Sequence, residues 1–271
     1  MSKKFQEIYE QSIKNPENFW QHASEDIFWF KKPTKILNKS NPPFFKWFED
    51  GVTNTCYNAL DIHIDQGRGE KIALIYDSPI TGNKNKFTYN ELRSKVAKFA
   101  GALIAQGTKK GDRVIIYMPM IPEAVIAMLA CARIGAIHSV VFGGFASNEL
   151  ASRIDDSKAK ILVTASCGFE PGRTVEYKPL VDEAIKIAKH NIDKMILFQR
   201  QGHEVKLNAP KEVSWKEVIT NANDADCVEM SSNEFAYILY TSGTTGTPKG
   251  IVRDIGGHIV ALKWTMKNIY N

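Results

Sequence analysis

The sequence predicts an α/β protein with a parallel sheet whose strands are joined by crossover helices. From about residue 70 onward, short runs of β-branched residues alternate with longer stretches in which apolar residues recur with helical period. With 271 residues, of which 44% are hydrophobic and 24% charged, the chain has an ordinary globular composition and can bury a large core. These values exclude a disordered, collagen-like or coiled-coil chain.

Residues 1–66 do not follow this pattern. They are rich in aromatic residues and are interrupted by Pro33, Pro42 and Pro43, which disfavour long regular elements. We therefore expect residues 1–66 to form an irregular arm wrapped over the core, and residues 67–271 to form the main domain.

Within residues 67–271, the first helix is expected to begin at Thr88. The Thr88 hydroxyl can accept from first-turn amides while Glu91 reaches back, and Gly107 is the expected end of this helix. Further strands are expected at 114–117, 137–142, 159–164, 194–198 and 235–240, and further helices at 122–133, 148–157, 178–190 and 257–268.

Charge and hydropathy limit the partners of the protein. The formal net charge is only +5 and the basic residues are scattered, which argues against a nucleic-acid partner. The longest apolar run, 124–132, is far shorter than the roughly 20 residues that cross a bilayer. The N-terminus has no apolar core typical of a signal peptide, so we expect a cytoplasmic protein without a membrane partner.

The cysteines and histidines show no metal-binding or disulfide pattern. Four cysteines are widely spaced without a C-x-x-C pair, and six histidines form no H-E-x-x-H set. We expect reduced, mostly buried thiols and no protein-bound transition metal. The cysteines are Cys56, Cys131, Cys167 and Cys227.

The most informative segment follows the apolar strand at 235–240. Of the seven residues 241–247, five carry hydroxyl groups and two are glycines, and a lysine comes two positions later. Hydroxyls, unobstructed backbone N–H groups and a lysine in one short bend are typical of a phosphate-binding loop. The candidate phosphate ligands are Thr241, Ser242, Gly243, Thr244, Thr245, Gly246, Thr247 and Lys249, with Lys249 also the candidate catalytic residue.

This loop differs from two common nucleotide-binding motifs. Pro248 precedes Lys249 and Gly250 follows it, whereas a Walker A loop needs Gly before the lysine and Ser or Thr after it. The sequence G-x-G-x-x-G is absent, so a Rossmann dinucleotide site has no support. The alternative is a Ser/Thr/Gly surface linker, which the ordered pattern after an apolar strand disfavours.

Residues 240–250 resemble the phosphate-binding signature of the adenylate-forming acyl-CoA synthetases. Residues 58–61, 119–136 and 142–145 are similar to the acetyl- and propionyl-CoA synthetase branch of that superfamily. The resemblance covers essentially the whole chain. It implies the large N-terminal domain of such an enzyme, with ATP, CoA and Mg²⁺ as cofactors.

The resemblance also implies a CoA-binding site. Residues 168–173 and 177–184 look more like propionyl-CoA synthetases, and Glu170 stands where acetyl-CoA synthetases usually carry an Arg that holds CoA phosphate. Arg173 matches the family's second Arg, although a solvated loop charge is the alternative. For Gly143 and Gly144, the alternative to a role in CoA binding is a tight turn. The implied CoA-binding residues are Gly143, Gly144, Glu170, Pro171, Gly172 and Arg173, whereas His138 and Trp264 are expected to pack in the core.

The implied activity is the ATP-dependent activation of a short-chain carboxylate to acyl-AMP with release of pyrophosphate, then to acyl-CoA. Propionate is favoured over acetate. In this family the acyl pocket, the magnesium ligand and a C-terminal catalytic lysine normally lie beyond the equivalent of residue 271. We therefore expect an incomplete adenylation domain without the small lid domain.

Two alternatives to an acyl-CoA synthetase remain at this stage. One is a catalytically silent fragment that binds ATP or CoA, and the other is a structural module whose loop is incidental. The oligomeric state is open, a homo-oligomer included.

Overall fold

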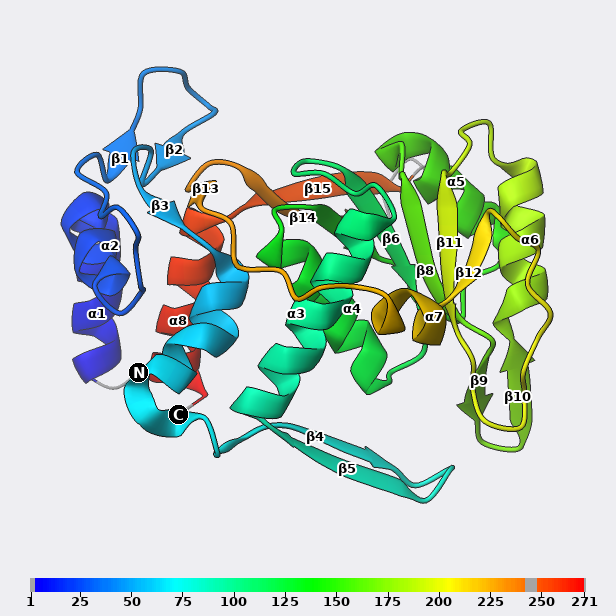
Figure 1. Cartoon of the computed structure of the whole chain (residues 1–271). Helices are drawn as coiled ribbons and strands as arrows, with labels where there is room; N and C mark the ends of the chain where they lie inside the picture. The colour runs from blue at the N-terminus through cyan, green and yellow to red at the C-terminus, as the bar shows by residue number, and fades with distance from the viewer. Residues whose placement is uncertain (1–2, 242–247, 271) are drawn as a thin grey trace.

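The computed structural model describes residues 3–241 and 248–270, and its centre is a seven-stranded sheet (Figure 1). All neighbouring strands are parallel except the last pair, which forms an antiparallel hairpin. The spatial order is β12 (Glu212–Ser214), β11 (Lys194–Phe198), β8 (Ile161–Ala165), β6 (Arg113–Tyr117), β7 (Ile137–Val140), β14 (Phe235–Thr241) and β15 (Lys249–Asp254). The predicted α/β class with a parallel sheet is confirmed.

Helices cover both faces of this sheet. Val114 and Ile116 of β6 pack with α3 (Tyr89–Ala105), α4 (Pro122–Arg133) and α7 (Trp215–Thr220). Ile115 and Tyr117 of the same strand pack with α5 (Ser147–Ser157) and α6 (Tyr177–Ile187). Because successive strand residues point to opposite faces, one apolar strand contributes to both cores.

The local signals in the sequence explain where several elements begin and end. Thr88 Oγ1 accepts from the Glu91 N–H at 3.2 Å, and a Glu91 carboxylate oxygen accepts from the Thr88 N–H at 2.8 Å. Gly107 follows α3 with a φ of +90°, a conformation that favours glycine. The strand expected at 137–142 ends at Val140, and the helix expected at 178–190 ends at Ile187.

The arm contains two helices that the sequence analysis did not expect. These are α1 (Lys3–Lys14) and α2 (Pro16–Ser24), so the expectation of an irregular segment without long helices was wrong. Asn15 caps α2 by accepting from the Asn18 N–H at 3.4 Å, and proline suits the first turn. The interrupting prolines all come after α2. The short elements β1 (Leu37–Asn38), β2 (Lys46–Trp47), β3 (Val52–Thr53), η1 (Tyr57–Asp61) and η2 (Ile64–Arg68) follow.

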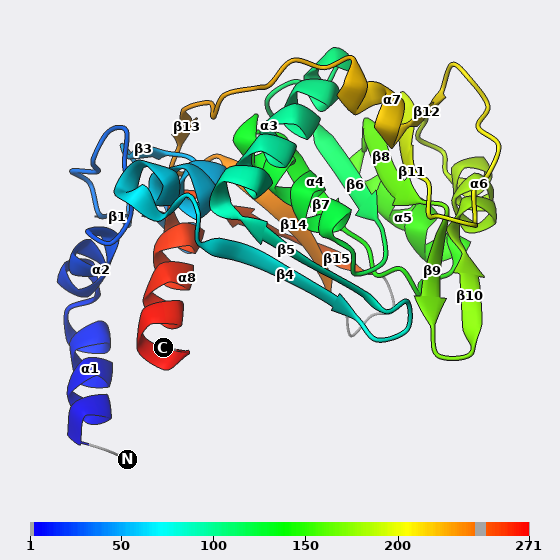
Figure 2. The ribbon, with the colours of Figure 1, turned by 60° about the horizontal axis from the view of Figure 1, so that its bottom comes forward.

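The arm packs against the last helix, α8 (Gly256–Ile269). Trp29 and Phe48 of the arm share a buried apolar cluster with Ile259 and Val260 of α8. Met230 of β13 (Met230–Ser231), which pairs with β3, joins the same cluster. Figure 2 shows α1 and α2 beside α8, away from the main sheet.

Two further hairpins lie outside the main sheet. They are β4 (Ile72–Ser78) with β5 (Asn83–Thr88), and β9 (Cys167–Glu170) with β10 (Arg173–Glu176). The β4–β5 hairpin runs along one edge of the molecule (Figure 2). Within the described ranges 3–241 and 248–270, no helix combines the length and apolar character needed to cross a bilayer.

Candidate functional site

The carboxyl ends of the parallel strands meet at one edge of the sheet, where the candidate site lies. From β6 the chain passes through α4 to β7 on one side and then through α5 to β8 on the other side of β6. Open α/β sheets bind ligands outside the carboxyl ends of their strands, at the point where the strand order reverses. Here that point is the region beyond β6, β7 and β8.

A cavity of about 410 Å³ lies at this position. The segments after β6, β7, β8 and β11 line it, and the end of β4 forms a further wall. Gly143, Gly144 and Glu170, three of the six residues expected to bind CoA, are among the lining residues. Segments that are far apart in the sequence are thus brought to one cavity.

Gly143 permits a close approach of a tyrosine to the backbone. A Cβ atom at Gly143 would lie 2.0 Å from the Tyr177 hydroxyl oxygen. The Tyr117 hydroxyl donates to the carbonyl of Phe145 at 2.7 Å and to that of Gly143 at 3.3 Å. The two glycines therefore form a tight turn, held by Tyr117, and also line the cavity.

The remaining predicted CoA-binding residues lie at the tip of the β9–β10 hairpin. Gly172 has a φ of +76° at this turn, and Pro171 precedes it. Arg173 Nη2 lies 2.6 Å from Glu170 Oε2, and the Arg173 side chain is 71% exposed. Glu170 thus faces the cavity and neutralises Arg173.

The predicted phosphate loop connects β14 to β15. Thr241 and Lys249 are paired across this hairpin, and Lys249 is exposed. Ser242, Gly243, Thr244, Thr245, Gly246 and Thr247 lie outside the described residues. Because β14 runs parallel to β7, both ends of the loop lie at the same edge of the sheet as the cavity.

Helix α5 holds the end of β14, a contact that the sequence analysis did not find. The Tyr240 hydroxyl donates to Asp156 Oδ2 at 2.6 Å. The Arg153 guanidinium lies over the Tyr240 ring at 5.3 Å and over the Phe145 ring at 4.8 Å. Burial, and then the bond to Asp156, raise the pKa of Tyr240, so its hydroxyl stays protonated. Arg153 and Asp156 are three residues apart on α5, a spacing that places them on one face.

A second missed residue, Arg200, lies directly after β11 and lines the same cavity. Its side chain lies over the Phe169 ring, with the guanidinium carbon 4.7 Å from the ring centroid. The sequence carries no local motif that distinguishes Arg200 from other arginines.

A buried ionic cluster joins the arm to the main domain. Arg133 donates to the two carboxylate oxygens of Asp61 at 2.7 and 3.0 Å, and to the Cys227 sulfur at 3.1 Å. Burial raises the pKa of Asp61, but hydrogen bonds and the positive charges of Arg133 and Arg93 outweigh it and leave the pKa lowered. Cys56, Asp61 and Cys227 lie close enough together to suggest a metal site, yet the guanidinium of Arg133 already contacts all three. The four cysteines are free thiols.

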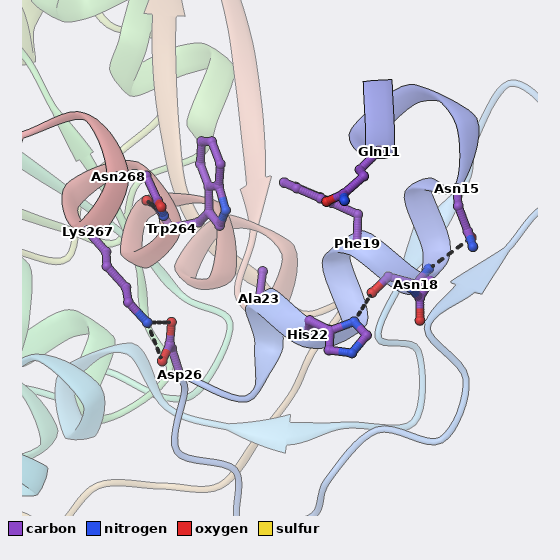
Figure 3. Close-up of a pocket in the computed structure, with 10 residues that line it drawn as sticks. All are labelled: Gln11, Asn15, Asn18, Phe19, His22, Ala23, Asp26, Trp264, Lys267 and Asn268. Carbon is purple, nitrogen blue, oxygen red and sulfur yellow. Dashed lines mark hydrogen bonds and ion pairs between the residues drawn. The ribbon is translucent and has the colours of Figure 1, made fainter. Parts of the chain in front are cut away.

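Two residues expected in the core lie at packed positions. His138 stacks on Tyr237 with ring centroids 5.4 Å apart, and burial, then the charge of His258, lower the pKa of His138 to about 4. Trp264 packs on Phe19 at 5.6 Å and borders a cavity of about 580 Å³ between α2 and α8, shown in Figure 3.

The fold and the cavity define an α/β protein with a candidate ligand site at the carboxyl edge of its sheet. The chain belongs to the AMP-binding enzyme family, whose profile matches residues 63–270, and residues 5–59 match the acetyl-coenzyme A synthetase N-terminus. The expected membership of the short-chain acyl-CoA synthetases is confirmed.

Three relatives illustrate this membership. The chain is 54% identical over 260 residues to the mitochondrial acyl-CoA synthetase short-chain family member 3 of Rattus norvegicus, covering 96% of this chain and 38% of that protein. It is 42% identical to the acetyl-coenzyme A synthetase of Streptomyces avermitilis, over 98% of this chain and 40% of that protein. The solved acetoacetyl-CoA synthetase from Streptomyces lividans superposes with a TM-score of 0.85 at 26% identity, covering 94% of this chain and 39% of that one. The chain therefore spans about two fifths of the length of these relatives.

Proposed function

We propose that this chain is part of an AMP-forming short-chain acyl-CoA synthetase that uses ATP and CoA. In the first step a carboxylate oxygen attacks the α-phosphorus of ATP, and the bond to pyrophosphate breaks. In the second step the CoA thiol attacks the acyl carbon, AMP leaves and the thiol proton is lost to solvent. The supporting observation is that the ends of the hydroxyl-rich loop and the 410 Å³ cavity lie at one edge of the sheet.

The residues at this edge have separate roles in the proposed reaction. Lys249, Thr241 and residues 242–247 neutralise and align the triphosphate, which lowers the barrier by positioning and by charge stabilisation. The cavity beside Gly143 and Gly144 receives CoA, with Glu170, Pro171, Gly172 and Arg173 at its hairpin rim.

Mg²⁺ is proposed as the counter-ion of the ATP phosphates. Asp156, the carboxylate in contact with the end of β14, accepts a hydrogen bond from the Tyr240 hydroxyl.

Propionate is the proposed substrate, with acetate as the alternative. The proposal depends on the resemblance of residues 168–184 to propionyl-CoA synthetases. Pyrophosphate release from ATP and Mg²⁺ with acetate, propionate or butyrate tests it. Release that is fastest with propionate supports the proposal, and faster release with acetate would overturn the preference.

The alternative function is a chain that binds ATP or CoA without catalysis. The described residues that support it are the candidate CoA cavity and the two ends of the phosphate loop, which can bind ligands without catalysis. Ligand at 100 times its dissociation constant stabilises a protein by about 2.7 kcal/mol, which a thermal melt detects. Stabilisation by ATP or CoA without pyrophosphate release would identify this alternative.

We propose that the protein is located in the cytoplasm, although the rat relative is named mitochondrial. Cell fractionation with an antibody against the chain tests this. Recovery with mitochondria would overturn it.

A further inference from the structure

Among the described residues, Arg200 is a buried cation that forms no ion pair. In the described part of the chain, four cationic side chains are buried, namely Arg133, Arg153, Lys178 and Arg200. The first three form ion pairs, with Asp61, Glu149 and Asp182 respectively. Arg200 is only 9% exposed, yet among residues 3–241 and 248–270 no carboxylate lies within ion-pairing distance of its guanidinium.

The position of Arg200 is fixed by its surroundings. Its backbone N–H donates to Ser166 Oγ at 2.9 Å, and the Ser166 N–H donates to the Phe198 carbonyl at 2.9 Å. The guanidinium carbon of Arg200 lies 4.7 Å from the centroid of the Phe169 ring. Arg200 lines both the 410 Å³ cavity and a neighbouring cavity of about 250 Å³. The cation is therefore oriented before any ligand arrives.

Because a buried charge is costly unless it is paired, this arrangement indicates a missing anion. A guanidinium presents a planar set of N–H donors that fits phosphate oxygens in bidentate fashion. The neighbouring cation at this end of the cavity, Arg173, is already paired with Glu170 at 2.6 Å. Glu123 lines the neighbouring 250 Å³ cavity, where burial raises its pKa and the charge of Arg200 opposes this, but the two side chains form no ion pair. Among the described residues that line the 410 Å³ cavity, Arg200 is thus a cation without an ion-paired carboxylate.

The distance across the sheet limits which ligand can reach both the phosphate loop and Arg200. From β11, which precedes Arg200, to β14, which precedes the phosphate loop, the order is β11, β8, β6, β7 and β14. Strands lie about 4.8 Å apart, so the two strand ends are about 19 Å from each other. A three-carbon acid that reacts at ATP is too short to span this distance. The long pantetheine arm of CoA separates the reacting thiol from the phosphate groups, so a phosphate of CoA can reach Arg200.

We propose that Arg200 binds a phosphate group of CoA and is the principal cationic anchor of the CoA site. This inference depends on the proposed function, since it takes CoA as the ligand. It goes beyond that function because it assigns the anchoring charge to a buried residue after β11 rather than to Arg173 on the exposed hairpin.

Calorimetric titration of the Arg200→Gln variant with CoA and with pantetheine tests the assignment. We expect Arg200→Gln to weaken CoA binding at least tenfold and to leave pantetheine, which lacks phosphates, unchanged. Arg200→Lys should recover part of the affinity. The matched control is Arg113→Gln, because Arg113 donates to the carbonyls of Ser157 and Lys158 at the opposite edge of the sheet and should not alter CoA affinity.

A thermal melt without ligand separates ligand binding from a structural role. Arg200→Gln should not lower the melting temperature, because it removes an uncompensated buried charge. A lowered melting temperature together with equal losses for CoA and pantetheine would overturn the assignment.

Two further outcomes distinguish this inference from the proposed function. Equal CoA affinity of Arg200→Gln and the unaltered protein would overturn the inference alone, with pyrophosphate release still supporting the function. No CoA binding by the unaltered protein would overturn both.

Discussion

The hydrogen bond from Tyr240 to Asp156 is predicted to set the affinity for ATP. Tyr240 is two residues from the start of the undescribed loop segment 242–247, and its hydroxyl lies 2.6 Å from Asp156 Oδ2. A hydrogen bond to a charged group contributes about 1.5–3 kcal/mol. In Asp156→Ala, the Tyr240 hydroxyl loses its acceptor. The end of β14 is then freed, and ordering it again on ATP binding costs up to this energy. We therefore expect ATP affinity to fall about 10- to 100-fold.

A double-mutant cycle with Tyr240→Phe measures the coupling. Because both substitutions remove the same bond, the double variant should bind ATP no more weakly than the weaker single variant. Asp155→Ala is the matched control, since Asp155 accepts from the backbone N–H of His190 at 2.7 Å and has no contact with Tyr240 among the described residues. Calorimetric titration with ATP and Mg²⁺ is the assay. Additive losses, or an equal loss in Asp155→Ala, would refute the reasoning.

Three further predictions follow from the structure. Lys249→Ala should reduce pyrophosphate release more than it lowers the melting temperature, because the side chain is exposed, and parallel losses in the two assays would contradict this role. Asp61→Asn should lower the free energy of unfolding in urea by about 3–5 kcal/mol, because it leaves the buried Arg133 unpaired, whereas Glu10→Gln in an exposed pair should cost at most about 1 kcal/mol. The folded-state pKa of His138 is about 4, below the ordinary value of 6.5. The stabilisation that comes from burying its neutral ring is therefore fully present above pH 6.5, and as the pH falls to about 4 the free energy of unfolding should drop by up to about 3 kcal/mol. NMR titration of its ring proton checks this, and a midpoint near 6.5 would contradict it.

Local patterns predicted the elements of the main domain well. The capping box of Thr88 and Glu91, Pro122 in a first turn and the apolar run of β11 each depend on neighbouring residues, and the structure has these elements at or close to the expected bounds. Helix α1 was missed although Phe5, Ile8 and Tyr9 recur three and four residues apart. Pro33, Pro42 and Pro43, which favour irregular structure, all lie after α1 and α2 and so leave these helices intact.

The site could be predicted only in part from the sequence, because the roles of its residues depend on contacts between segments that are distant in the sequence. Gly143 could be selected by resemblance, but the reason that it is glycine is the approach of Tyr177, 34 positions later in the sequence. Arg200 is distinguished by a buried guanidinium that forms no ion pair with any described carboxylate, a property that no sequence pattern carries.

Pyrophosphate release by the protein encoded from start to stop codon is the most direct test of the proposed function. ATP and Mg²⁺ are supplied with acetate, propionate and butyrate in turn, first without and then with CoA. The proposed function predicts pyrophosphate release that depends on the acid and is fastest with propionate, with acyl-CoA formed when CoA is present. No pyrophosphate with any of the three acids would contradict it.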